Sequence, residues 1–337
     1  MASHPQNVVA PGQPAFTQAA MPVLYDEAFK YMRESSVELL KTWQQSFVTC
    51  SEENDASDHQ YLEVGCGPGN ITRNDLLPLC PPSLTRLVGT DISEAMLDYA
   101  RNVNAHPKVH YRRLDITADE DVSRFIAEEG RFQRVYSFFA LHCIQDKAAA
   151  LRNIERLMTP GGECLIIYHP YAQSAKYYRA LLESGLWEKY HGVLWRTMPV
   201  FHETDDPVFL RKSFLDLVKL TGIVPLSCEL LQVNVKNVDL DVISRMFAMG
   251  NAVHRLLTEE EKTKMFEFAK SYVLQNQCSL GKCISRMIIL TGSFAKISPI
   301  YDLLTEEEKP LSFKFTEKFL LQGRCSGFST TGSTQQH

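Results

Sequence analysis

The sequence predicts an α/β fold, built as a doubly wound, mostly parallel seven-stranded sheet with helices on both faces and a helical lid insertion. Short apolar segments alternate with amphipathic segments between residues 61 and 168, and this alternation is typical of a parallel sheet covered by helices. The first apolar segment, Tyr61–Val64, leads into a glycine-rich turn. The second apolar segment ends in Asp91, at the carboxyl end of its strand, where such folds bind nucleotides.

Each element is predicted from its own pattern of apolar and turn-forming residues. Strands are expected at Tyr61–Val64, Arg86–Gly89, Val109–Arg113, Phe132–Phe138, Gly162–Tyr168, Leu226–Val235 and Arg286–Thr291. Helices are expected at Tyr25–Val48, Ile71–Leu79, Glu94–Asn102, Asp119–Glu129, Leu151–Met158, Lys212–Thr221 and Leu257–Gln275.

Local signals mark several of these ends. Pro81 and Pro82 cannot continue the second helix, because proline lacks a backbone N–H and clashes with the preceding turn. Ser93 is a suitable N-cap for the helix that follows it, since its hydroxyl can accept from an unpaired helix N–H. Thr159–Gly162 predicts a turn before the fifth strand.

Composition divides the chain into three parts. Residues 1–22 are expected to be a disordered arm, because the start is rich in Ala, Pro and Gln. Residues 23–291 are expected to form the folded domain, and residues 292–337 a partly disordered tail. Residues 170–200 are rich in aromatic side chains, which predicts a helical lid over an apolar pocket or an extra pair of helices burying aromatics against the core. These two interpretations are compatible.

Charge and cysteine content argue against several classes of protein. The net charge of −5 gives a nucleic-acid partner no electrostatic support. No apolar run reaches the roughly 18–20 residues of a membrane span. The nine cysteines include no C-x-x-C pair and no His at zinc spacing, so we expect no metal site and reduced thiols in the cytoplasm. The oligomeric state has no signal in the sequence.

Glu63–Gly69 carries the pattern E-x-G-x-G-x-G. Glycines accept positive φ and let the backbone approach a ligand closely. The dinucleotide fingerprint G-x-G-x-x-G is one residue longer in its last interval, and Pro68 removes an N–H that a phosphate would use. Together with Asp91 and Leu114–Ile116, the turn resembles that of the class I, Rossmann-like S-adenosylmethionine-dependent methyltransferases. The resemblance implies that the last strand is antiparallel.

The same resemblance assigns cofactor roles along this edge of the sheet. The ribose hydroxyls are expected on Asp91, whose two carboxylate oxygens match a vicinal diol, and the amino group on Glu63 through water. Asp115 and the Ile116 N–H are expected at the adenine. Two alternatives stay open, namely Asp91 as a cap of the next helix and Asp115 as a loop or cap residue. The predicted cofactor-binding set is Glu63, Gly65, Gly67, Gly69, Asp91, Ile92, Met96, Asp115, Ile116 and Ser137.

A narrower resemblance, to arthropod juvenile hormone acid O-methyltransferases, covers roughly residues 24 to 275. It implies methylation of the carboxylate of a small apolar acid, farnesoic acid or juvenile hormone acid. His142 is expected to line the acceptor site or to fix the following loop. The matching segments are Gly65–Thr72, Gly89–Met96, Leu114–Ile116, Ser137–Asp146 and Asn153–Leu157.

Two acceptor-pocket positions depart from that family. The family holds the substrate carboxylate with a Gln on its N-terminal helix and a Trp after its Leu-His pair, whereas this chain has Met32 and Cys143 there. Neither side chain donates a good hydrogen bond. Two other hypotheses therefore stay open: methylation of a different small-molecule nucleophile, and a protein that binds the cofactor or a terpenoid without catalysis.

Overall fold

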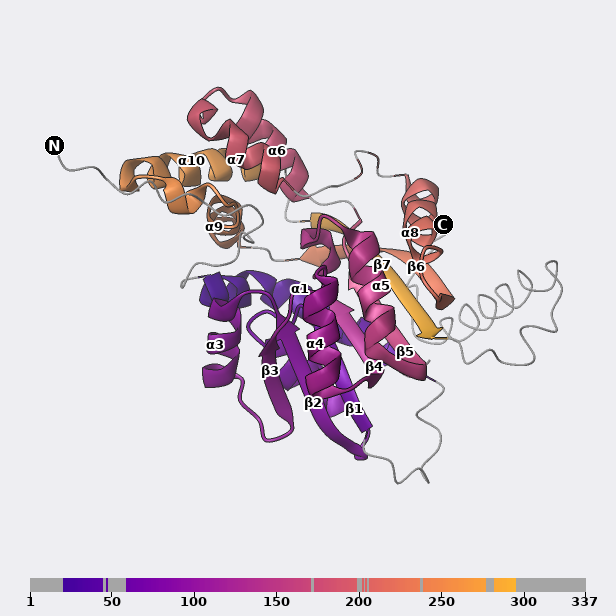
Figure 1. The fold of residues 1–337 in the computed structure, drawn as a ribbon. Coiled ribbons are helices and arrows are strands. Elements are labelled where there is room, and N and C mark those ends of the chain that lie inside the picture. The colour runs from indigo at the N-terminus through magenta and orange to yellow at the C-terminus, as the bar shows by residue number, and fades with distance from the viewer. Residues whose placement is uncertain are drawn as a thin grey trace, which may run out of the picture.

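The computed structural model describes residues 21–44, 47, 59–170, 173–198, 202, 204, 206–236, 239–276 and 282–294. Seven strands form one sheet in the order β3-β2-β1-β4-β5-β7-β6. β1 to β5 are parallel, and β7 is antiparallel to both β5 and β6, which confirms the predicted fold class (Figure 1). The strands are β1 His59–Val64, β2 Leu84–Asp91, β3 Val109–Arg113, β4 Phe132–Phe138, β5 Met158–Tyr168, β6 Ile223–Lys236 and β7 Lys282–Phe294.

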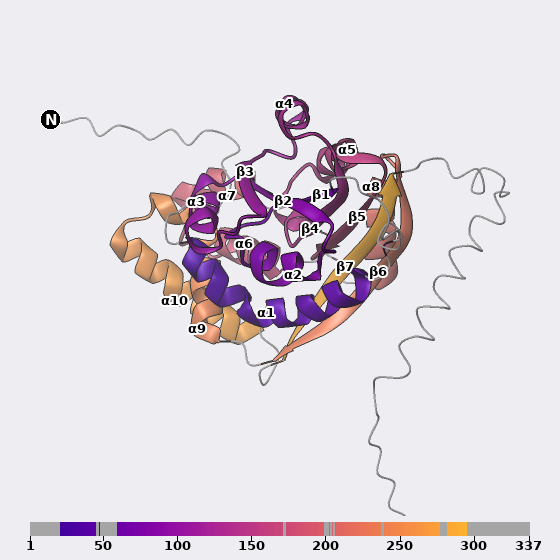
Figure 2. The same cartoon turned by 90° about the horizontal axis from the view of Figure 1, so that it is seen from below.

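Helices cover both faces of the sheet and gather above one end of it. α1 and α2 lie on one face, and α4 and α5 lie on the opposite face (Figure 2). The helices are α1 Met21–Gln44, α2 Leu77–Leu79, α3 Glu94–Val103, α4 Asp119–Glu129, α5 Lys147–Leu157, α6 Gln173–Glu183, α7 His191–Thr197, α8 Pro207–Val218, α9 Leu240–Met249 and α10 Glu259–Asn276.

Each face of the sheet has its own apolar core. On one face, residues of α4, α5 and α8 such as Phe125, Ile154 and Phe214 pack against the strands. On the other face, Trp43 of α1 and Leu97 of α3 do so. Burial of both sheet faces explains why the central strands are apolar along most of their length.

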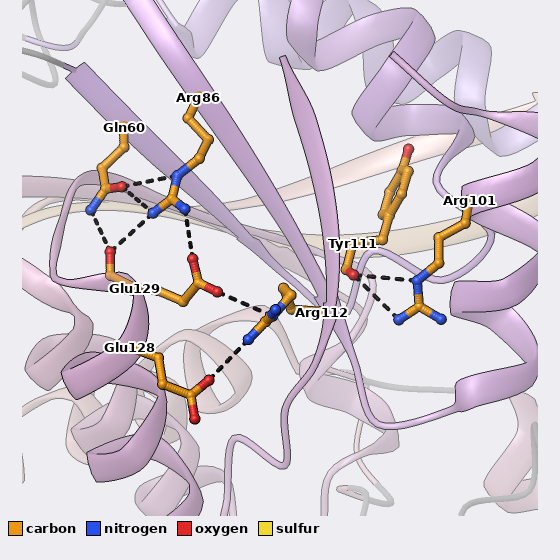
Figure 3. Close-up of polar contacts among 7 residues, drawn as sticks. All are labelled: Gln60, Arg86, Arg101, Tyr111, Arg112, Glu128 and Glu129. Atoms are coloured by element: carbon orange, nitrogen blue, oxygen red, sulfur yellow. Dashed lines mark hydrogen bonds and ion pairs between the residues drawn. The ribbon is translucent and has the colours of Figure 1, made fainter. Parts of the chain in front are cut away.

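A polar cluster fastens the C-terminal end of α4 to β1, β2 and β3. Arg86 of β2 pairs with Glu129 at 2.7 Å and donates to the side-chain oxygen of Gln60 (Figure 3). Arg112 of β3 pairs with Glu128 at 2.9 Å. In the same view Arg101 donates to the Tyr111 carbonyl at 3.3 Å, which joins α3 to β3. These contacts set the position of the helices around the sheet.

Several boundaries differ from the prediction for identifiable reasons. α5 begins at Lys147, four residues before Leu151, because Asp146 accepts from the Ala149 N–H at 2.8 Å and caps the helix. The segment expected as a regular helix from Ile71 is π-helical over Thr72–Leu76. Turn residues 159–162 fall within β5 as the structure bounds it. α1 begins at Met21, inside the arm predicted over 1–22, and β7 continues to Phe294, inside the tail predicted over 292–337; residues 1–20 and those beyond 294 lie outside the described residues.

α6, α7, α9 and α10 form a helical cluster above the sheet (Figure 1). The expected insertion supplies α6 and α7, and α9 was not predicted from the sequence. Buried aromatics of the insertion, Tyr177, Tyr178 and Trp187, share one core with residues of α9 and α10 such as Ala248 and Met265. The aromatic side chains are therefore buried within the helical cluster, and the role of the insertion as a lid stays a prediction.

Candidate cofactor and acceptor site

The glycine turn leaves β1 in the predicted left-handed conformation. Gly65, Gly67 and Gly69 have φ values of +76°, +54° and +80°. A side chain on Gly65 would collide with Cβ of Ala140, whereas one on Gly67 would meet its nearest atom, Cε1 of Tyr25, at 4.0 Å. The Gly65 N–H donates to the Thr90 carbonyl at 2.7 Å, which ties the turn to β2. Gly65 is thus required by packing, while an added Cβ on Gly67 would only touch the Tyr25 ring of α1.

Glu63 supplies a buried negative group below this turn. Its side chain is 1% exposed, and its Oε2 has no hydrogen-bond partner among the described residues. Burial raises the pKa of Glu63 to about 7. A buried carboxylate oxygen without a partner is costly unless a ligand satisfies it, so this position fits a cationic group such as a ligand ammonium.

Asp91 joins the end of β2 to the glycine turn. Its Oδ2 accepts from the Gly67 N–H at 3.0 Å, and its Oδ1 accepts from the Ser93 N–H at 2.8 Å. The residue that caps α3 is Ser93, whose hydroxyl accepts from the Met96 N–H, so the predicted N-cap is confirmed. Burial raises the pKa of Asp91. Each carboxylate oxygen has two lone pairs, so Asp91 can accept from a diol as well.

Two apolar residues of the predicted cofactor-binding set, Ile92 and Met96, follow the end of β2, and Met96 lies in the first turn of α3. Met96 is buried and packs with Leu24 and Tyr25 of α1 and with Met246 and Met249 of α9. Ile92 before it is half-buried. Together these side chains make an apolar surface of the kind that a flat aromatic base can contact.

Asp115 and Ser137 have structural contacts of their own. Oδ1 of Asp115 accepts from the N–H and the hydroxyl of Thr117, at 2.9 and 2.7 Å, which is the geometry of a loop-stabilising aspartate. The Ile116 carbonyl accepts from Asn153 at 2.9 Å. Ser137 is fully buried and donates to the Val64 carbonyl at 3.1 Å, joining β4 to β1. Cofactor contact by Asp115, Ile116 and Ser137 stays a prediction.

The acceptor side begins where β4 ends. Phe139 has φ = +55°, an unusual value for a residue with a side chain, and a 3-10 turn over Leu141–Cys143 follows. The His142 ring lies 5.3 Å from the ring of His169. Its Nδ1 is buried without a hydrogen-bond partner among the described residues. Burial, and after it the nearby His169 and Lys147, holds the pKa of His142 well below its usual range, so the imidazole is neutral at pH 7.

Cys143 is exposed to solvent and yet closely surrounded by protein. Desolvation raises the pKa of its thiol to about 12, with a further contribution from Asp91. This combination is expected at the wall of a recess. The thiol is protonated at neutral pH and is therefore a poor nucleophile. Met32 lies on α1, and its side chain is outside the described part of the structure.

Tyr25 and Lys147 belong to the site and were not singled out from the sequence. Burial, followed by the charges around Cys143, Asp91 and Glu63, raises the pKa of Tyr25 above its usual range, which places its hydroxyl among the predicted site residues. Tyr25 lies seven residues before Met32 on α1, close to two helical turns. The only sequence signal was its place on the amphipathic helix, which does not say which residues it faces.

Neither a metal centre nor a membrane span has support in the described part of the chain. No group of three or more His, Cys, Asp or Glu side chains there is arranged to hold a metal ion. None of the helices described is both long and apolar enough to cross a bilayer.

Comparison with known proteins identifies similar sequences. A family model described as "Methyltransferase domain" matches residues 62–164. The juvenile hormone acid O-methyltransferase of Bombyx mori is 31% identical over 191 residues, which are 56% of this chain and 66% of that protein. The Drosophila melanogaster protein of the same name is 32% identical over 171 residues, 50% of this chain and 54% of its own length. The match therefore spans less than two thirds of either relative.

Solved methyltransferase structures align with much of the chain at low identity. A putative methyltransferase from Bacillus halodurans is 15% identical with a TM-score of 0.44, covering 75% of this chain and 99% of its own. A phosphoethanolamine N-methyltransferase from Haemonchus contortus, solved with S-adenosyl-L-methionine, is 14% identical with a TM-score of 0.47, covering 86% and 61%.

Proposed function

We propose that this chain, whose residues 62–164 form a methyltransferase domain of the Rossmann-like class, transfers a methyl group from S-adenosylmethionine to the carboxylate of a small lipophilic acid. The acceptor class follows the names of the relatives, juvenile hormone acid O-methyltransferases. Farnesoic acid and juvenile hormone acid are the acceptors to test first. The observation that carries the proposal is the buried carboxylate of Glu63, whose Oε2 has no hydrogen-bond partner among the described residues, next to the glycine turn that Asp91 holds.

The residues at this edge of the sheet fit the cofactor. When bound, S-adenosylmethionine supplies an electrophilic methyl group on a sulfonium centre. Glu63 would hold the ammonium group and Asp91 the ribose hydroxyls, while Ile92 and Met96 would contact the base. Both acidic groups also favour a ligand of net positive charge.

The acceptor side supports a substrate that is already a nucleophile. A carboxylic acid is ionised at neutral pH and needs no general base. The neutral His142 and the protonated Cys143 are therefore suited to line and position rather than to activate. In-line displacement depends mainly on alignment of the reacting atoms and on exclusion of water. The helical cluster that contains α7 is tied to the loop after β4, because Gln145 Nε2 donates to the Arg196 carbonyl at 2.9 Å.

The test is a methyl-transfer assay with the full chain and isotope-labelled S-adenosylmethionine. Farnesoic acid and juvenile hormone acid are compared with farnesol, which has the same apolar chain and no carboxylate. We expect labelled ester from the acids only, and loss of transfer in Asp91→Ala with activity retained in Asp98→Ala, whose side chain lies exposed on α3. Transfer to farnesol but not to the acids would indicate a different nucleophile, a candidate motivated by Met32 and Cys143, neither of which donates a good hydrogen bond to a carboxylate.

Cofactor binding without transfer to any acceptor would contradict an enzymatic role. We also propose that the folded domain spans residues 23–291, that the protein is located in the cytoplasm and that it has no nucleic-acid partner.

A further inference from the structure

Lys147 places a positive charge at the acceptor side of the site. It is the first residue of α5, directly after the cap residue Asp146. Its Nζ donates to the Ile144 carbonyl at 2.8 Å, which turns the ammonium back over the loop that follows β4. The side chain is partly buried, and burial lowers its pKa. A lysine held in this way presents a partly desolvated charge, which interacts more strongly with an anion than a fully solvated lysine does.

The groups around Lys147 are those of the predicted acceptor pocket. After the effect of burial, the Lys147 charge contributes to lowering the pKa of both His142 and His202, and it also acts on the Cys143 thiol. His202 precedes α8 and lies edge-on to the Phe209 ring at 5.0 Å. The charge of this ammonium therefore reaches two segments far apart in the sequence, one after β4 and one before α8.

The site consequently has an acidic end and a basic end. Glu63 and Asp91 lie at the ends of β1 and β2, on the cofactor side. Lys147 lies beyond the end of β4. Cys143 lies in the 3-10 turn before α5, and after the effect of burial the charge of Asp91 raises the pKa of its thiol while that of Lys147 lowers it. A cationic methyl donor matches the acidic end, and an anionic acceptor matches the basic end.

We propose that Lys147 binds the carboxylate of the acceptor, with His142 lining the same position. Lys147 thereby supplies the hydrogen bond to the carboxylate that Met32 and Cys143 cannot donate. This inference rests on the proposed methyltransferase function. Lys147 acts as a binding and specificity residue: its charge selects acids over neutral molecules of the same shape. The buried Nδ1 of His142, which lacks a partner among the described residues, is the second polar atom available there.

Calorimetric titration of the full chain, saturated with S-adenosylhomocysteine, tests the proposal. Farnesoic acid and its methyl ester are titrated separately, because they differ only in the charge of the head group. We expect the wild-type chain to prefer the acid by about 10- to 100-fold, the range of one charge-assisted hydrogen bond. In Lys147→Met this preference disappears while binding of the ester and of S-adenosylhomocysteine is unchanged. Lys147→Arg, which retains the charge, restores part of the preference.

Lys212→Met is the matched control, since Lys212 lies on α8 and pairs with Asp216 at 2.8 Å. It should retain the full preference for the acid. An undiminished preference in Lys147→Met, or a loss of acid, ester and cofactor binding together, would overturn the role of Lys147. If Lys147→Met does not fold, Lys147→Gln takes its place under the same criteria. A wild-type chain that binds the cofactor but no acid would instead refute the proposed acceptor class, and the role of Lys147 with it.

Discussion

Single residues of the site are held by burial as much as by hydrogen bonds. Glu63 is the clearest case, because its carboxylate lies beneath the glycine turn with one oxygen lacking a partner among the described residues. Its pKa of about 7 lies above the ordinary value of 4.5, so the folded chain binds a proton more tightly there than the unfolded chain does. Cofactor binding and stability should therefore respond to pH in opposite directions.

Binding of S-adenosylmethionine should weaken as the pH falls below about 7, because protonation removes the negative charge of Glu63, which we propose holds the ligand ammonium. The expected loss is about tenfold per pH unit at most. Calorimetric titration at pH 6 and pH 8 measures it. Glu63→Gln should bind more weakly at pH 8 and lack this pH dependence, and an unchanged dependence in that variant would assign it to another group.

The ligand-free chain should lose stability as the pH rises from 4.5 to about 7, the window between the unfolded and folded pKa values of Glu63. The raised pKa contributes stability that is fully present below 4.5 and is gone above about 7. The contribution of this group is at most about 3 kcal/mol, from 1.36 kcal/mol per unit. Urea unfolding of the wild type and of Glu63→Gln across this range checks it, with the variant expected to show the smaller decrease.

Gly65 tests the packing of the turn. Gly65→Ala should destabilise the protein by about 1–3 kcal/mol, because φ is +76° and the new methyl group would collide with Ala140. Gly192→Ala is the matched control, since Gly192 lies in α7 with no atom within 4 Å of an added Cβ. It should be neutral or stabilising by up to about 1 kcal/mol. Equal midpoints of urea unfolding for the two variants would contradict this account.

At the scale of elements, the start of α5 determines where the acceptor side lies. The helix begins at Lys147 because Asp146 caps it, and the 3-10 turn with His142 and Cys143 comes just before. Had α5 begun at Leu151, as the apolar periodicity predicted, Lys147 would have belonged to a loop. The cap thus holds the backbone of Lys147 in the first turn of α5.

Asp146→Ala should destabilise the protein by about 1 kcal/mol through loss of this cap. It should also reduce the preference for farnesoic acid over its methyl ester, because the backbone of Lys147 is no longer held at the start of α5 by the cap. Asp98→Ala, on the exposed side of α3, serves as the control. Urea unfolding and the same ligand titrations provide the readouts. A full preference for the acid in Asp146→Ala would show that Lys147 does not need the cap to bind the carboxylate.

At the scale of the whole molecule, the helical cluster joins parts of the chain that are distant in sequence. α6 and α7 bury their aromatics against α9 and α10, and α9 also reaches α1 through Met246 and Met249 beside Tyr25. The cluster and the site therefore share the start of α1. We expect damage to the cluster to affect acceptor binding as well as stability.

Leu181→Ala should cost about 2–5 kcal/mol, because this side chain is fully buried in the core of the helical cluster. Leu186→Ala, in the same insertion but 66% exposed, should change stability by less than about 0.5 kcal/mol. Thermal unfolding compares the two. Equal effects would mean that the insertion does not depend on the core it shares with α9 and α10.

The sequence by itself determined the sheet and the glycine turn, because these follow from local patterns. Val109–Arg113 and Phe132–Phe138 were predicted to the residue, as was the helix Asp119–Glu129. The positive φ of Gly67 and the cap Ser93 were also local signals. The cofactor side of the site could be proposed for the same reason, since the residues proposed there lie at or near the ends of predicted strands.

Only the tertiary structure decided the acceptor side. Tyr25 lies against the glycine turn and Lys147 follows the turn that holds His142 and Cys143, because helices distant in the sequence pack around the same strand ends, and no periodicity in the chain carries that information. α9 was missed, and the extents of β6 and β7 were underestimated, because these elements are stabilised by partners far along the chain. Local patterns thus determine which elements form, whereas long-range packing determines which side chains face one another.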